Sequence, residues 1–139
     1  MKELDPIRLQ CRTNDMQRHY EEFIVLGPDY IWSLDGHDKL SDWGIEIYAA
    51  IDAYSRFIIW IYVGISNRME QSVLVQYNQT VSQIGYYPQI LRTNCGKEIL
   101  LMAELHFALA RTNEPGLQMS NCYYYGSSRK NQQIEAWWS

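Results

Sequence analysis

The sequence lacks paired cysteines, a long apolar run and an excess of basic residues. Its three cysteines stand at positions 11, 95 and 122 with no CxxC spacing, which excludes a disulfide-rich scaffold and suggests no zinc motif. The longest strongly apolar run, residues 57–65, has nine residues and is too short to span a bilayer. No apolar signal segment lies in the first 26 residues. With 139 residues, we expect one globular domain and no membrane partner, in the nucleus or another reducing intracellular compartment.

The charge is low and unevenly distributed. Charged residues make up 20% of the chain, and the formal net charge is −4. Residues 29–52 hold six acids and one lysine, a net charge of −5, whereas the rest of the chain holds eleven bases and ten acids, a net charge of +1. A negative total weighs against a strong polyanion binder. The acidic segment itself is compatible with a solvated face or with a cation site.

The periodicity of apolar residues predicts a mixed α/β fold. Alternating or continuous apolar runs predict strands, and apolar residues at helical spacing predict helices. The expected strands are 30–35, 45–51, 57–63, 89–93 and 117–123, and the expected helices are 67–84, 97–110 and 131–138. The resulting order, βββαβαβα, predicts a five-stranded mixed sheet with helices on its faces, as in the ribonuclease H-like architecture.

Four segments carry specific motifs in a fixed order. They read Gly-Pro-Asp-Tyr-Ile-Trp-Ser-Leu-Asp-Gly at 27–36, Ile-Asp-Ala-Tyr-Ser-Arg at 51–56, Arg-Thr-Asn-Cys-Gly-Lys-Glu at 92–98, and Asn-Gln-Gln-Ile-Glu-Ala-Trp-Trp-Ser at 131–139. Together they resemble the integrase core domains of transposon-related proteins of fungi and animals, which are relatives of retroviral integrases and DDE transposases. The resemblance covers about residues 27–139 and implies a DNA partner and a homo-oligomer.

The resemblance implies a site in which three carboxylates hold two Mg²⁺ or Mn²⁺ ions for phosphoryl transfer. The first carboxylate position falls on Asp35 and the third on Glu135. The second position falls on Asn94, where the family pattern has aspartate. A neutral amide offers one carbonyl oxygen and cannot bridge two dications as a carboxylate does. We therefore expect Asp35 and Glu135 as metal ligands, and DNA strand transfer that is lost or severely impaired.

Two other functions are compatible with these residues. A non-catalytic DNA-binding or protein-interaction module that keeps the fold is the main alternative, because Asn94 removes a catalytic carboxylate. A ribonuclease H-type nuclease acting on RNA–DNA hybrids is disfavoured by the motifs at 51–56 and 131–139. DNA contacts are expected from Arg129, Lys130 and Asn131, just before the third carboxylate position.

Several residues near the motifs have competing interpretations. Asp52 is expected to cap the turn between two strands rather than to bind metal. Asp38 and Glu98 are possible compensating carboxylates, and His37 is expected in a loop. The tyrosines at 123–125 either stack on an unpaired base or pack against a sheet edge.

The domain boundaries follow from the motifs. Residues 1–26 are expected to be a lead-in segment and residues 27–139 the integrase core-like domain. Because Glu135 stands four residues before the end of the sequence, we expect the last helix to be cut short.

Overall fold

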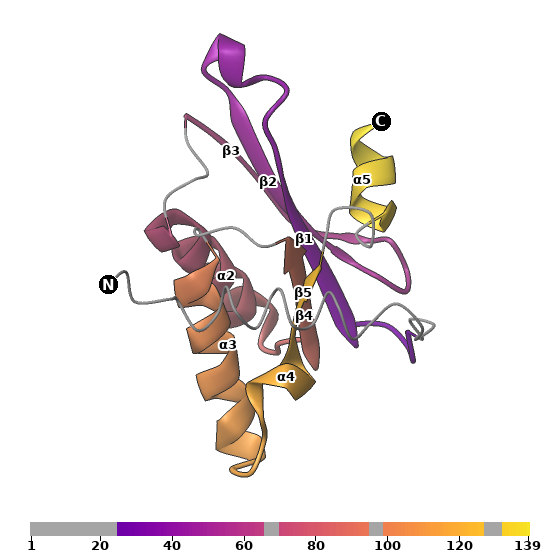
Figure 1. Cartoon of the computed structure of the whole chain (residues 1–139), viewed down its shortest axis with the longest axis vertical. Coiled ribbons are helices and arrows are strands. Elements are labelled where there is room, and N and C mark those ends of the chain that lie inside the picture. Colours follow the sequence, from indigo (N-terminus) through magenta and orange to yellow (C-terminus); the bar gives the residue numbers. More distant parts are fainter. Residues whose placement is uncertain (1–24, 66–69, 95–98, 127–131) are drawn as a thin grey trace, which may run out of the picture.

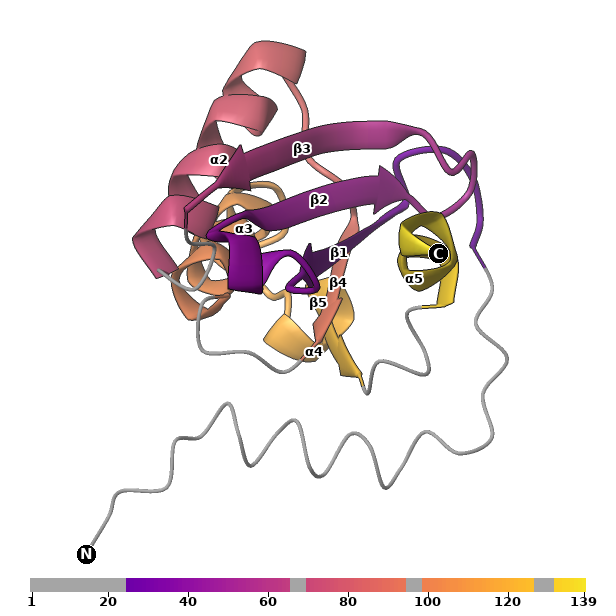
Figure 2. The same ribbon diagram turned by 90° about the horizontal axis from the view of Figure 1, so that it is seen from above.

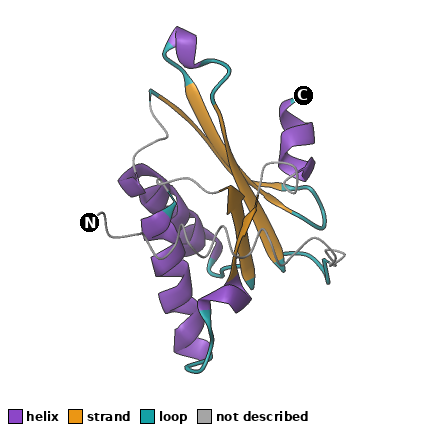
Figure 3. Ribbon diagram, viewed as in Figure 1, coloured by secondary structure: helices purple, strands orange, loops and turns teal. Residues whose placement is uncertain are grey.

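The computed structural model describes residues 25–65, 70–94, 99–126 and 132–139. These residues form a five-stranded mixed sheet with helices, which confirms the predicted ribonuclease H-like α/β fold (Figure 3). Along the chain the elements are β1 (Ile31–His37), η1 (Ser41–Trp43), β2 (Glu46–Asp52), β3 (Ile58–Gly64), α2 (Glu70–Ile84), β4 (Ile90–Asn94), α3 (Leu100–Asn113), α4 (Met119–Cys122), β5 (Tyr123–Gly126) and α5 (Gln132–Trp138).

The strands lie in the order β3-β2-β1-β4-β5. Short connections join β1, β2 and β3, and these three strands are antiparallel. The connections through α2 and through α3 and α4 are long enough to return the chain in the same direction, so β4 and β5 run parallel to β1. Strand β1 therefore lies at the centre of the sheet, between β2 and β4.

Helices cover the two faces of the sheet unequally. Helices α2 and α3 lie against one face and α5 lies against the other (Figures 1 and 2). The main core fills the first interface, where Trp32 and Leu34 of β1 pack in one cluster with Val73, Tyr77 and Met102. A smaller cluster of Ala49, Ile51 and Ile134 fills the second interface. Successive residues of a strand point to opposite faces, which explains how β2 serves both clusters, with Tyr48 and Ala50 in the first and Ala49 and Ile51 in the second.

The predicted fifth strand, 117–123, is wrong in position. The segment Met119–Cys122 is the short helix α4, and the strand β5 follows it at Tyr123–Gly126. The polar residues Ser120 and Asn121 give that stretch no strand pattern, whereas three consecutive tyrosines are well suited to a strand. Tyr123 and Tyr125 are 1% and 3% exposed and belong to the main core cluster, so they are not available to stack on a base.

Two further expectations concern membrane spans and the lead-in segment. None of the helices within the described ranges is both long and apolar enough to cross a membrane. The proposed lead-in, residues 1–26, lies almost entirely outside the described residues, so its boundary with the core stays a prediction.

Candidate functional site

Asp35 and Asn94 meet at the ends of two neighbouring parallel strands. Asp35 lies in β1, and Asn94 is the last residue of β4. The two strands pair through Ser33 and Arg92, and the same register continued by two residues places Asp35 opposite Asn94. The Asn94 Nδ2 group donates a hydrogen bond of 2.8 Å to Asp35 Oδ1. Two positions 59 residues apart in the sequence are thus in direct contact, as the motifs predict.

The two partners of this hydrogen bond are only half-buried as residues, but the other amide atom is fully enclosed. Asn94 Oδ1 is buried and has no hydrogen-bond partner in the described part of the chain. Asp35 also pairs in register with Ala49 of β2. Because Ala49 packs against α5, Asp35 lies on the face of the sheet that carries α5.

Helix α5 brings the third motif position to the same face. Ile134 is fully buried against Ala49 and Ile51, and this contact fixes one side of the helix on β2. Glu135 follows Ile134 in α5, although its side chain is not among those the structure describes. Because β2 pairs with β1, the helix also lies beside β1. The position of the Glu135 carboxylate stays a prediction.

A ring stack holds the end of α5 on β1. The His37 imidazole and the Trp138 indole have ring centroids 4.8 Å apart and planes inclined by 24°. The prediction of a loop at His37 is wrong, because the strand continues through Gly36 and His37 is the last residue of β1. Trp138 stands four residues after Ile134, so both side chains lie on the same face of the helix. The helical spacing predicts Trp137 on that face too, yet it is 44% exposed.

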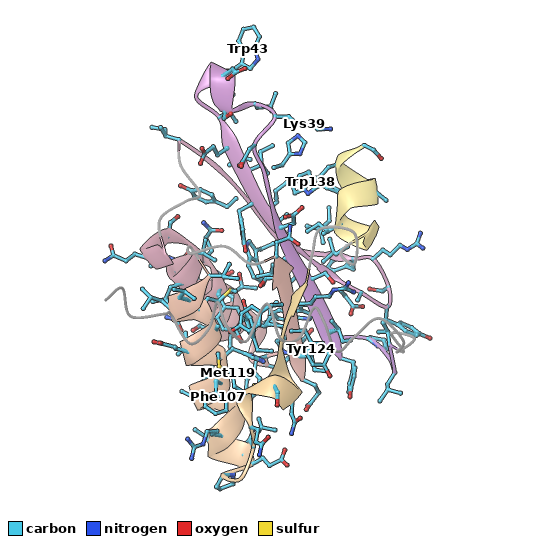
Figure 4. The ribbon with its side chains drawn as sticks, in the orientation of Figure 1. Lys39, Trp43, Phe107, Met119, Tyr124 and Trp138 are labelled. Atoms are coloured by element: carbon cyan, nitrogen blue, oxygen red, sulfur yellow. The ribbon has the colours of Figure 1, made fainter. Side chains whose placement is uncertain are left out.

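A shallow groove of about 590 Å³ runs beside this stack. Figure 4 shows Trp138 of α5 and Lys39 of the β1–β2 connection near one another, while Trp43 projects from the far end of that connection. Two carboxylates and one ammonium group line the groove. Its net negative charge disfavours the binding of a bare phosphate. Its lining residues are Asp35, Gly36, His37, Asp38, Lys39 and Trp138.

Several sequence-predicted positions lie outside the described residues. The expected DNA contacts Arg129, Lys130 and Asn131 are among them, as is Glu98. Asp38 is exposed and lines the groove, but within the described segments it is not part of any cluster able to hold a metal ion.

Asp52 is a buried capping residue, as predicted. It is 2% exposed, and its carboxylate accepts hydrogen bonds from the backbone N–H groups of Asp29 at 3.0 Å and Ser55 at 2.9 Å. The Ser55 hydroxyl also donates to Asp52 Oδ2. Asp29 adopts a left-handed backbone with φ of 57°, and its own carboxylate accepts a 3.0 Å hydrogen bond from Trp32 Nε1. These bonds fix the turns at the opposite end of β1 from Asp35.

A buried polar network links the helices α2, α3 and α4, and sequence reasoning missed it. His106 is fully buried in α3, and its Nε2 lies 3.1 Å from the Cys122 carbonyl. That carbonyl can only accept, so His106 Nε2–H donates and Nδ1 accepts from the Tyr77 hydroxyl at 2.8 Å. Burial lowers the pKa of His106 to about 4 and raises the pKa of Tyr77. An apolar helix with one histidine gave no signal for this arrangement beyond the histidine itself.

The fold and the contact between Asp35 and Asn94 define the class: a ribonuclease H-like α/β domain with a polar site where β1 and β4 end. A family model described as integrase core domain matches residues 22–139. The chain therefore belongs to the integrase core domain family. No curated protein matches the chain.

The integrase core family generally uses divalent metal ions, and the described donor atoms at this site, those of Asp35 and Asn94, do not fit a pair of them. The described residues hold no group of three histidine, cysteine, aspartate or glutamate side chains placed to share an ion. Asp35 meets an amide N–H rather than a second carboxylate. A cation needs oxygen ligands from both residues, but Asn94 presents its donor to Asp35 and its oxygen to a buried space.

Proposed function

We propose that this domain is an integrase core of the polynucleotidyl-transferase type in which metal-dependent DNA strand transfer is lost or severely impaired. The domain would extend over residues 27–139 and derive from a transposon-related integrase of the fungal and animal type. DNA would be its partner, with self-association as in related multimeric enzymes.

One observation carries the proposal. Asn94 stands where the motif has its second carboxylate, and its amide is hydrogen-bonded to the first, at 2.8 Å from Asp35 Oδ1. The loss of one negative charge from a site built for dications weakens their binding, because the bridging ligand must balance two doubly charged ions. Asp35 and Glu135 then remain as the first and third carboxylates of a site that lacks the second.

The remaining site residues would contribute to DNA binding. Arg129, Lys130 and Asn131 precede α5 in the sequence, so their side chains would reach phosphates close to the ends of β1 and β4. The net charge of −4 limits this contribution, and DNA affinity should fall steeply with salt.

The test compares the chain with its Asn94→Asp variant in a strand-transfer assay with Mg²⁺ or Mn²⁺. Asn94→Asp, which restores the family motif, should transfer strands far faster than the chain itself. Asn78→Asp serves as the matched control, because Asn78 is exposed on α2 and the change adds the same charge away from the site. Equal strand transfer by the chain and by Asn94→Asp would refute the proposed impairment.

The same Asp35–Asn94 contact supports the second candidate, a non-catalytic DNA-binding or protein-interaction module. DNA binding without turnover, by both the chain and Asn94→Asp, would favour this module over an impaired enzyme. Cleavage of an RNA–DNA hybrid would instead assign a ribonuclease H-type nuclease.

A further inference from the structure

The contact between Asp35 and Asn94 lies beyond the last paired residues of the β1–β4 ladder. That register runs through Ser33 and Arg92. The side-chain hydrogen bond of 2.8 Å adds a link two residues further along both strands. It joins the ends of two strands that belong to different parts of the chain, so it acts at a point where the sheet would otherwise begin to separate.

The orientation of the Asn94 amide is the one that electrostatics favours beside a carboxylate. If the amide were rotated by a half turn about its Cβ–Cγ axis, Oδ1 would face Asp35 Oδ1 at a distance near 2.8 Å. Two acceptors that close repel each other unless a proton or a cation lies between them. The amide nitrogen provides that proton directly. Asn94 Oδ1 is left buried without a partner in the described ranges, and the carboxylate hydrogen bond offsets part of that cost.

From these contacts we infer that Asp35 and Asn94 form a carboxylate–amide clasp that replaces the metal ions as the link between β1 and β4. The amide N–H takes the electrostatic role of a cation against Asp35. The native fold then needs no divalent ion at this site, and an ion would have to break the hydrogen bond before it could bind both side chains. The former catalytic aspartate is thereby a structural residue.

The clasp predicts opposite responses to divalent ions in the chain and in its Asn94→Asp variant. In the variant, two carboxylates face each other at hydrogen-bonding distance and repel, so its melting temperature should fall by several degrees in EDTA. Mn²⁺ or Mg²⁺ should restore the loss by binding between them. The melting temperature of the unmodified chain should not change with these ions by more than that of Asn78→Asp, which controls for added charge and ionic strength.

A charge exchange tests the pairing itself. Asp35→Asn removes the acceptor charge, and the double variant Asp35→Asn with Asn94→Asp restores one amide and one carboxylate in exchanged positions. In EDTA, the clasp predicts that the double variant loses less free energy of unfolding than the two single variants lose together. A purely additive result, measured by urea unfolding, would overturn the clasp.

The clasp deepens the proposed function at the same site, yet each can fail alone. Stabilisation of the unmodified chain by Mn²⁺, beyond that of Asn78→Asp, would overturn the clasp even if no strand transfer occurred. Strand transfer by the unmodified chain, together with non-additive coupling in EDTA, would refute the proposed impairment and leave the clasp as the ion-free state. If Asn94→Asp did not fold, the ion response of the unmodified chain would still decide the matter.

Discussion

The His37 ring stacks on the Trp138 indole, with centroids 4.8 Å apart, and so ties the end of α5 to the end of β1. Helix α5 has seven residues and is too short to be stable by itself in water. Its position depends on this stack and on the buried Ile134. The two contacts lie four residues apart on one helix face and fix the rotation of the helix about its axis.

Removal of the stack should loosen α5 without unfolding the sheet. His37→Ala should cost about 1 kcal/mol, the usual contribution of an aromatic pair beyond its buried area. Hydrogen exchange at the amides of α5 should become faster, while that of β1 and β2 stays slow. Ala136→Ser is the matched control, since Ala136 is exposed on the same helix. Unchanged exchange in α5 for His37→Ala would contradict this role of the stack.

Removal of the Asp52 carboxylate should strongly destabilise the fold. In Asp52→Ala, the backbone N–H groups of Asp29 and Ser55 lose a buried, charged acceptor. We expect a loss of about 3 kcal/mol in the free energy of unfolding. Urea unfolding measures it, with Asp42→Ala in the exposed η1 turn as the control that should change stability by less than about 0.5 kcal/mol. Equal losses in both variants would rule out the capping role.

Stability should fall as the pH drops from about 6.5 to about 4, because of His106. The pKa of its imidazole is about 4 in the fold against an ordinary value of 6.5, so only the unfolded state binds this proton in that window. Protonation of the unfolded state then lowers the free energy of unfolding by up to an amount on the order of 3 kcal/mol. Above pH 6.5 this group causes no such loss. The pH dependence of urea unfolding should be flatter in His106→Gln than in the chain, and identical slopes would exclude this assignment.

Loss of the Tyr77 hydroxyl should leave His106 Nδ1 buried without its 2.8 Å donor. Tyr77→Phe should reduce the free energy of unfolding by about 1–2 kcal/mol, the cost of one unsatisfied buried acceptor. Tyr54→Phe removes a hydroxyl from a side chain that is 58% exposed and should have almost no effect. Thermal unfolding of the two variants, compared in the same buffer, gives the answer, and a silent Tyr77→Phe would contradict the network.

Sequence reasoning found what depends on local pattern and missed what depends on distant neighbours. The strands around Asp35 and Asn94 follow from their periodicity, and the motifs alone are sufficient to assign both residues to one site. The predicted fifth strand is wrong in position, because Ser120 and Asn121 interrupt the apolar pattern of 117–123 and the tyrosines from Tyr123 onward are better suited to a strand. The pairing of Asn94 with Asp35 through its nitrogen is a tertiary contact that no local pattern encodes.

The two faces of β1 carry separate tasks, and this separation has a consequence for how the domain tolerates change. Trp32 and Leu34 point into the core beneath α2 and α3, while Asp35 and His37 line the groove beside α5. A substitution on the second face alters chemistry without disturbing the packing of the first. A domain built in this way can therefore change the residues of its groove one at a time and keep an intact scaffold on which selection for a different task can act.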